Sequence, residues 1–286
     1  MFCHHVVITT LFCRQRSIRS FFDAMTPAYT VEALLAPAQF GPILLARDAF
    51  DRHVAIKRIH CRKRLAQHER AMNLRLPPHP HVVRCVHAFD LEDDVSHLVF
   101  EFCPHGDLQT HLQRHVRLPE SLALVCLRQI VAGVAHAHRH GVAHRDLSPE
   151  NIFLDVNLDC KVGDFGLAVA LPTICDGRVG KPLYMAPEVY GQTYYDPAKA
   201  DVWSLGALFF IMLTGVPIVD VAAPTDPRFC MLQAAGVQAL LAAQSTNVSP
   251  VTVAILESML TTDPFERISM DELVKVVALG ERLQGS

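Results

Sequence analysis

Short apolar runs separated by polar, glycine or proline residues dominate the chain from residue 29 to about residue 102. Three such runs come first, at 29–35, 42–46 and 53–59, and two more follow at 81–88 and 96–102. Apolar segments of this length between turn-forming residues are typical of β-strands. A highly charged stretch between the third and fourth runs, 62–75, has helical character and ends before Pro77 and Pro78. The pattern predicts five strands and one helix in this part of the chain.

The pattern becomes helical at Pro119. Apolar residues recur at three- and four-residue spacing from 122 to 134, which predicts a helix. Further helices are predicted at 226–243, 250–260 and 270–283. The most apolar stretch, 205–219, is interrupted by Gly215 and Pro217 and ends at Asp220. It is shorter than the ~18–20 residues that a membrane span needs, so we expect a buried core helix and no membrane span.

Composition narrows the classes of function. Lys and Arg number 26 against 29 Asp and Glu, a formal net charge of −3, so no bulk basic surface indicates a nucleic-acid partner. The nine cysteines include no C-x-x-C pair and indicate neither a zinc site nor a disulfide framework. Buried thiols in a reducing compartment are the better interpretation, and we expect a cytoplasmic protein. His136, His138 and His140 look like metal ligands, but residues two apart on a helix point away from one another, so we expect surface or helix-end histidines.

Residues 1–28 differ in composition from the rest. Arg14, Arg16 and Arg19 precede the first acidic residue, Asp23, which resembles a weak organelle-targeting peptide in residues 1–24. The segment could equally be an unstructured extension, or an upstream artefact if Met25 is the true start. We favour a flexible extension.

The loop at 144–151, HRDLSPEN, carries the strongest chemical signal. It follows an apolar helical run and precedes a short apolar run, 152–154, that predicts a strand. Asp146 can accept a proton from a hydroxyl group or orient it, and the amide oxygen of Asn151 can hold a divalent cation. Asp164-Phe165-Gly166 follows at a spacing that a short hairpin would span. The two motifs resemble the H-R-D-x-x-x-x-N loop and the D-F-G motif of eukaryotic-type protein kinases, serine/threonine branch.

The resemblance covers nearly everything from 29 to 283 and implies an α+β fold with two lobes. A small antiparallel sheet with one helix would form residues 29–103, and a larger, mainly helical lobe would form residues 104–283, with ATP between them. Lys57, at the end of the V-A-I-K strand, would pair with the α- and β-phosphates and with Glu69. Asp146 would orient the acceptor hydroxyl, and Asn151 and Asp164 would hold Mg²⁺.

The nucleotide-binding half departs from the family in its phosphate-covering loop. That loop usually reads G-x-G-x-x-G, and here it reads APAQFG from 36 to 41. Alanine and proline should stiffen it, so we expect weaker ATP binding rather than its loss. Asn73, four residues after Glu69, stands where the family has an apolar residue, which leaves open a one-residue shift or a less tightly packed helix. The remaining residues that the resemblance sets around the nucleotide are Ala36, Ala38, Gly41, Ile43, Ala55, the gatekeeper Phe100, the backbone of Glu101 and Cys103, Asp107 near the ribose, and Phe153.

Two further departures lie close together in the family's site. Two residues after the catalytic Asp, where the family usually has a Lys that meets the γ-phosphate, stands Ser148. After Gly180, where the family usually has Thr or Ser, stands Lys181. We hypothesise that Lys181 supplies the ammonium group that Ser148 lacks, which adds both residues to the catalytic group of Asp146 and Lys57. The alternative is two independent changes, with Lys181 solvated.

The segment after Gly166 ends in A-P-E at 186–188, like a kinase activation segment. By resemblance, Asp201 would anchor the backbone of the catalytic loop, and Arg267 would pair with Glu188.

Arg145 is the residue that, in many kinases, receives a phosphate group carried by the activation segment. The hydroxyl-bearing residues of this segment are Thr173 and Tyr184, and Tyr184 resembles a packed structural tyrosine. Thr173 is therefore the predicted phosphosite, and Asp176 is the alternative, as a permanent negative charge.

The sequence thus predicts a serine/threonine protein kinase that transfers the γ-phosphate of MgATP to protein substrates. Asp107 and Glu150 lie where basophilic kinases bind an arginine before the target, which implies a mild preference for basic substrates. A pseudokinase that acts as an interaction scaffold is the main alternative, favoured by the altered loop and Ser148. A small-molecule kinase on the same fold is disfavoured by the A-P-E segment and the helix from 226.

Overall fold

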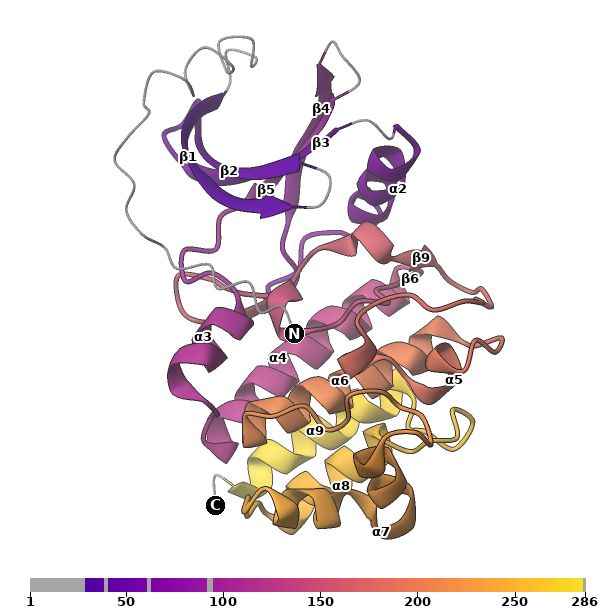
Figure 1. Cartoon of the computed structure of the whole chain (residues 1–286). Helices are drawn as coiled ribbons and strands as arrows, with labels where there is room; N and C mark the ends of the chain where they lie inside the picture. The colour runs from indigo at the N-terminus through magenta and orange to yellow at the C-terminus, as the bar shows by residue number, and fades with distance from the viewer. Residues whose placement is uncertain (1–28, 39–40, 61–62, 92–94, 285–286) are drawn as a thin grey trace.

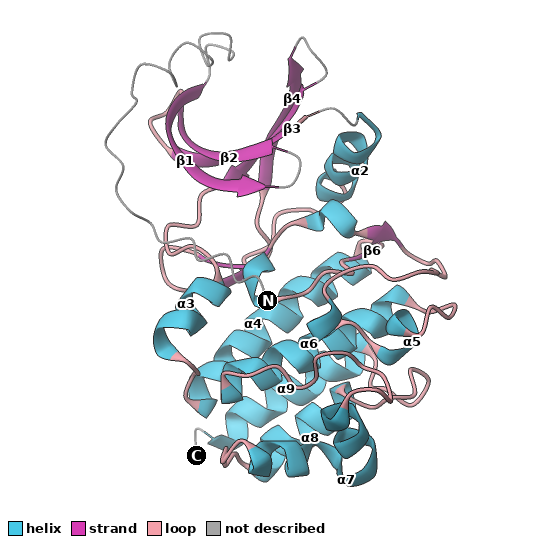
Figure 2. Cartoon of the chain, viewed as in Figure 1, coloured by secondary structure: helices cyan, strands magenta, loops and turns pink. Residues whose placement is uncertain are grey.

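The structure, a computed structural model, describes residues 29–38, 41–60, 63–91 and 95–284. The extension predicted for residues 1–28 lies outside the described residues, as do Gln39 and Phe40 of the phosphate-covering loop. The described chain forms an upper lobe of strands with one helix and a lower lobe that is mainly helical (Figures 1 and 2). This is the two-lobed α+β architecture that the sequence predicts.

One antiparallel sheet forms the upper lobe. The fourth predicted strand starts late, because Val82 and Val83 pair with the lower lobe instead. The N–H of Val83 donates to the carbonyl of Val162 over 2.8 Å, and Val82 forms a bridge with the same residue. The strands are β1 (Tyr29–Ala38), β2 (Gly41–Asp48), β3 (His53–Ile59), β4 (Cys85–Leu91) and β5 (Val95–Glu101), in the order β1-β2-β3-β5-β4.

The helix of the upper lobe, α2 (Lys63–Leu74), packs beside this sheet (Figure 1). Ala66 is buried against Ile59 of β3 and Leu98 of β5. This small apolar contact fixes the helix relative to the strand that ends near Lys57, so two segments that carry charged groups are held side by side.

Helices that the sequence predicts make up most of the lower lobe, with small shifts at their ends. The carboxylate of Asp226 accepts hydrogen bonds from the N–H groups of Arg228 and Phe229, so it caps the helix that was predicted to start there. The helices are α3 (Leu108–His115), α4 (Glu120–Arg139), α5 (Pro187–Tyr190), α6 (Pro197–Thr214), α7 (Pro227–Ala243), α8 (Pro250–Met259) and α9 (Met270–Gln284).

Two short antiparallel pairs frame the catalytic loop. β7 (Ile152–Leu154) pairs with β8 (Cys160–Val162), and β6 (Val142–Ala143) pairs with β9 (Val169–Ala170). The first pair is the hairpin that the spacing between the two kinase-like motifs predicts. Together the pairs hold both ends of the loop in the lower lobe.

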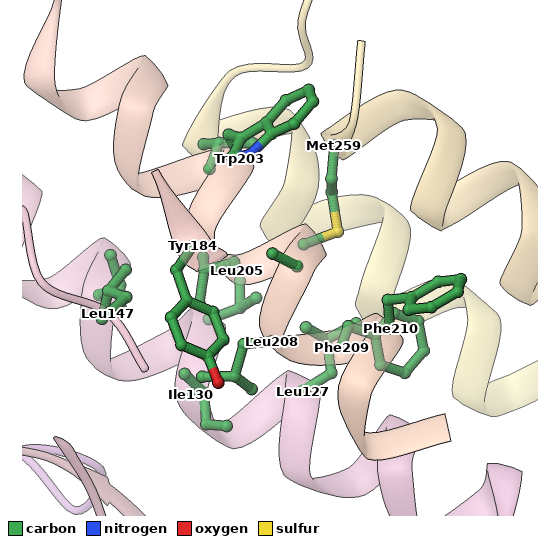
Figure 3. Packing of buried hydrophobic residues seen from close by; sticks show 14 of the residues in the cluster. Leu127, Ile130, Leu147, Tyr184, Trp203, Leu205, Leu208, Phe209, Phe210 and Met259 are labelled. Carbon is green, nitrogen blue, oxygen red and sulfur yellow. The ribbon is translucent and has the colours of Figure 1, made fainter. Parts of the chain in front are cut away.

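The core of the lower lobe surrounds α6, whose residues from 200 to 214 are all buried. Leu205 and Leu208 of α6 lie among Leu127 and Ile130 of α4 and Met259 of α8 (Figure 3). A helix that is apolar on all sides is stable only when neighbours cover it completely. The buried helix predicted from 205 to 219 is confirmed, although it ends at Thr214 and Gly215 caps it at φ 80°.

Among the described residues, one helix is long and apolar enough to cross a membrane, and it is α4 rather than the stretch singled out in the sequence. Of its most apolar 18-residue window, 67% is buried inside the molecule. Packing in the core accounts for its apolar character.

The three histidines lie at the end of α4, which is one of the two expected placements: His136 and His138 are in its last turn and His140 follows it. His136 is buried, and its Nε2 lies 2.9 Å from the carbonyl of Pro77, while its ring stacks on His79 at 4.5 Å. The segment that leads into β4 covers this end of the helix, so His136 is a helix-end histidine but not a surface one. Within the described residues no cluster of His, Cys, Asp and Glu has the geometry of a metal site.

Candidate active site

Lys57, Glu69 and Asp164 meet between the lobes. The Nζ atom of Lys57 lies 2.8 Å from a carboxylate oxygen of Glu69 and 3.0 Å from one of Asp164. Strand β3 brings Lys57 here, and helix α2 brings Glu69. Asn73 is buried one turn further along α2, and its amide nitrogen donates to the carbonyl of Glu69 over 2.9 Å. The helix is therefore in the register that the sequence first assigned, and the one-residue shift is wrong.

Pairing outweighs burial for the charges of Lys57 and Asp164. Burial opposes the charge of Lys57, but Glu69 and Asp164 raise its pKa above the usual value. Burial likewise opposes the charge of Asp164, but Lys57 lowers its pKa below the usual value. Burial, and to a smaller extent the nearby Asp164, raise the pKa of Glu69 above its usual value, although the Lys57 ammonium group 2.8 Å away opposes this rise. The group is one cation between two anions.

The backbone at Asp164 aims its side chain at Lys57. Asp164 has left-handed φ and ψ values of 60° and 74°, and its carboxylate accepts from the N–H of Gly166 over 3.2 Å. Phe165 is fully buried, with its ring 4.8 Å from that of His144. The imidazole of His68 on α2 reaches the carbonyl of Ala168 at 2.7 Å. These contacts tie the segment after Asp164 to both lobes.

The catalytic loop rests on a buried carboxylate. Asp201, at the start of α6, accepts from the N–H of His144 at 2.7 Å and from the N–H of Arg145 at 2.8 Å. His138 of α4 lies 2.8 Å from the same carboxylate, a contact that the sequence did not indicate. Burial opposes the charge of Asp201, but the hydrogen bonds from His138 and from the loop lower its pKa. The anchor predicted for Asp201 is in place.

Asp146 and Asn151 are joined across the loop. The amide nitrogen of Asn151 donates to the carbonyl of Asp146 at 2.7 Å and to its carboxylate at 2.9 Å. Because the amide nitrogen is committed to Asp146, the amide oxygen is left to face a cation. One carboxylate and one amide oxygen, completed by phosphate oxygens and water, suit Mg²⁺, which seldom takes an all-protein cage. Asn151 and Asp164 therefore fit the metal that the family uses.

Lys181 reaches the loop from the activation segment. Its ammonium group lies 2.9 Å from the hydroxyl of Ser148 and 3.4 Å from the carboxylate of Asp146. It also lies 3.0 Å from the carboxylate of Glu150, a contact that the sequence analysis missed. Gly180 has φ 97°, and a Cβ there would come within 2.6 Å of the Arg145 carbonyl, so only glycine lets this segment approach so closely. Lys181 is therefore engaged with the loop rather than free in solvent.

The residues assigned to the nucleotide lie along the sheet and the segment that leaves it. Ile43 faces Ala36 and Lys57 across the sheet, Ala55 faces Phe100, and Ala38 ends β1 opposite Gly41. Cys103 is buried just after β5, and Phe153 lies on β7 in a bridge with Asp107.

Two acidic residues of this set have structural partners. The carboxylate of Asp107 accepts from the N–H of Thr110 at 2.6 Å and caps α3. The side chain of Glu101 accepts from the N–H of Arg84 at 2.7 Å and from Lys161 at 3.1 Å. The Asp107 cap was not expected from the sequence, although Asp directly before a helix is a known signal for one.

Two sets of contacts hold the C-terminal end of the activation segment. Arg267 makes two hydrogen bonds with the carboxylate of Glu188, at 2.7 and 3.0 Å, as predicted. Tyr184 is buried, and its carbonyl accepts from the hydroxyl of Ser204 at 2.7 Å, so it is the packed tyrosine expected.

Arg145 has protein partners in the activation segment. Its guanidinium group donates to the carbonyl of Leu167 at 2.8 Å and lies 3.7 Å from the sulfur of Cys175. Thr173 is half-buried two residues away from Cys175. Phosphorylation of Thr173 stays a prediction.

Comparison with known proteins agrees with this geometry. A family model described as the protein kinase domain matches residues 29–277. Serine/threonine protein kinase OSK3 of Oryza sativa subsp. indica is 32% identical over 259 residues, which cover 86% of this chain and 49% of that protein. CBL-interacting serine/threonine-protein kinase 7 of Arabidopsis thaliana is 33% identical over 272 residues, covering 85% and 63%. The chain thus spans about half the length of the rice kinase.

The match covers both lobes and every residue of the geometry above, from Lys57 in β3 to Arg267 before α9. The chain belongs to the protein kinase domain family.

Proposed function

We propose that the chain is an active serine/threonine protein kinase that transfers the γ-phosphate of MgATP to hydroxyl groups of protein substrates. The observation that carries this proposal is the contact of Lys57 with both Glu69 and Asp164, at 2.8 and 3.0 Å. The contact joins three segments of the chain that must come together for nucleotide phosphates to be held. A scaffold without activity would need none of these pairs.

The residues divide the chemistry between them. Lys57, oriented by Glu69, binds the α- and β-phosphates. Asn151 and Asp164 hold Mg²⁺, which neutralises charge on the phosphate oxygens when it is bound. The carboxylate of Asp146, oriented by the Asn151 amide at 2.9 Å, accepts the hydrogen bond of the acceptor hydroxyl and directs the oxygen toward the γ-phosphate. Positioning and charge neutralisation supply most of the rate in phosphoryl transfer.

Lys181 and Ser148 complete the group of residues that take part in phosphoryl transfer. An ammonium group 3.4 Å from the Asp146 carboxylate lies beside the point where the hydroxyl oxygen meets the phosphoryl group. A cation there stabilises the negative charge that is shared between the two oxygens during transfer. The Ser148 hydroxyl, 2.9 Å away, and Glu150 hold the lysine in this position. Lys181 thus takes the place of a cation on the loop itself.

A phosphotransfer assay tests the function. The full chain is incubated with radiolabelled ATP, Mg²⁺ and casein, in parallel with the Asp164→Ala and Asp146→Asn variants. We expect label on casein serine and threonine with the wild-type chain and background levels with both variants. Asp271→Ala, which removes an exposed carboxylate on α9, is the matched control and should keep full activity. Wild-type incorporation no higher than that of Asp164→Ala would refute the proposal.

A further inference from the structure

The two carboxylates that a basic substrate would use are both engaged within the protein. Glu150 pairs with Lys181 at 3.0 Å, and Asp107 caps α3 through the Thr110 N–H at 2.6 Å. Glu150 is the closer of the two to the reaction centre, because the same ammonium group touches both Glu150 and the Asp146 carboxylate.

We propose that Lys181 determines substrate choice by masking Glu150, so that the kinase phosphorylates serine and threonine in segments without an arginine beside the target. This inference rests on the proposed function. It adds a specificity role to Lys181 and replaces the mild preference for basic substrates expected from the sequence.

The distances within the site limit the effect of Lys181 to substrate side chains close to the target residue. Lys181 spans the Asp146 and Glu150 carboxylates, at 3.4 and 3.0 Å, so Glu150 lies within two short contacts of the carboxylate that binds the acceptor hydroxyl. Successive residues of an extended peptide are about 3.3 Å apart, so side chains one to three residues from the target can reach Glu150. An arginine at these positions would face the Lys181 ammonium group as well as the Glu150 carboxylate, and the repulsion from the lysine offsets the attraction to the carboxylate.

The net charge of the site determines whether an arginine beside the target is favoured. Asp146, Glu150 and Lys181 together carry a net charge of −1, and removal of Lys181 would make it −2. The side chains of Glu150 and Lys181 are 56% and 35% exposed, so their pairing is partly screened by water. Exposed ion pairs of this kind are weak, and we expect masking to change selectivity by about twofold to fivefold.

Two peptide series test the inference. Their members share one target serine and differ only by arginine or alanine at a single position within three residues of it. The measured quantity is the ratio of kcat/KM for the arginine peptide to that for the alanine peptide. We expect a ratio near one for the wild-type chain and a ratio raised about twofold to fivefold in Lys181→Met at the position that reaches Glu150. The double variant Lys181→Met/Glu150→Gln should return to the wild-type ratio.

Control variants and a binding measurement distinguish a failure of this inference from a failure of the proposed function. Glu150→Gln alone and Lys275→Met, an exposed lysine on α9, should leave the ratio unchanged. Peptides with alanine in place of the target serine give the same ratio from equilibrium binding, which does not depend on turnover. An arginine preference that is equal in the wild-type chain and in Lys181→Met would overturn the inference. Absence of phosphate transfer to any substrate would instead overturn the proposed function, and the binding ratios would still decide whether Lys181 masks Glu150.

Discussion

The side chain of Asp201 is fully buried and holds the backbone of the catalytic loop at His144 and Arg145, with His138 as a third partner. A buried carboxylate is tolerated only when hydrogen bonds replace its water, and here the loop supplies two of them. The conformation of the loop and the charge of Asp201 therefore depend on each other. Asn73 on α2 is likewise a buried polar side chain with a hydrogen-bond partner, because its amide nitrogen donates to the Glu69 carbonyl of the preceding turn.

His97 is buried, and its surroundings in the folded chain disfavour the protonated, charged form of the imidazole. It lies in β5 with no exposed surface, and its ring stacks on Phe89 at 4.9 Å. Burial, and then the positive charge of Arg58, lower its pKa to about 4. Between pH 4 and about 6.5 the unfolded chain binds more protons at this site than the folded one, so the free energy of unfolding falls as the pH is lowered through this window.

His97→Leu should remove this pH-dependent fall in the free energy of unfolding. We expect the wild-type chain to lose about 1–2 kcal/mol more stability than the variant between pH 7 and pH 5. Urea unfolding at the two pH values measures the difference. His105→Leu, at an exposed position, is the control and should keep the wild-type pH dependence. If His97→Leu also keeps it, the pKa of His97 is not lowered in the folded chain.

At the level of elements, the β1–β2 hairpin explains which glycine the phosphate-covering loop retains. Gly41 has φ 146°, and a Cβ there would come within 2.3 Å of the Arg58 carbonyl. Ala36 and Ala38 lie in β1, opposite Ile43 and Gly41. The backbone at 36 and 38 is thus ordinary strand, where alanine is tolerated but limits the approach of the chain to phosphate.

Ala36→Gly/Ala38→Gly should strengthen nucleotide binding. Removal of both methyl groups lets the hairpin approach the phosphates, so we expect the KM for ATP to fall severalfold with little change in kcat. Steady-state kinetics at saturating protein substrate measure it. An unchanged or higher KM would show that the alanines do not limit ATP binding.

The pair of Glu188 and Arg267 joins α5 to the segment before α9. Both side chains are almost completely buried, and Arg267 also donates to the carbonyls of Thr261 and Lys199. Removal of one partner from a buried ion pair leaves the other charge without compensation.

Arg267→Met should therefore lower the free energy of unfolding by about 3–5 kcal/mol. Methionine keeps the apolar part of the side chain, so the decrease in the free energy of unfolding measures the effect of removing the guanidinium charge and its hydrogen bonds. Denaturant unfolding gives the value, with Arg178→Met, at an exposed site in the activation segment, as the control. A loss below that of the control would mean that Glu188 finds another partner or water.

For the whole molecule, local periodicity predicted most of the strands and helices in their order along the chain. The two lobes and the residues that meet between them followed from the resemblance of short motifs to the kinase family, because Lys57 and Asp164 are 107 positions apart. The predicted start of β4 was wrong because residues 81–83 pair with Val162, some 80 positions later, which no local pattern reveals. The pairs of Glu150 with Lys181 and of Asp201 with His138 were missed for the same reason, since each joins segments that only the folded lower lobe brings together.

We propose that this chain has a complete catalytic site, with Lys181 as the cation beside Asp146. Phosphotransfer by the wild-type chain, Lys181→Ala and Ser148→Lys/Lys181→Thr tests it in one measurement of kcat. Lys275→Ala serves as the control for loss of an exposed lysine. We predict an active wild-type chain, a loss of about 10²-fold in Lys181→Ala, and recovery of most of that loss in the double variant, which returns the cation to the loop. Wild-type activity in Lys181→Ala would contradict the claim.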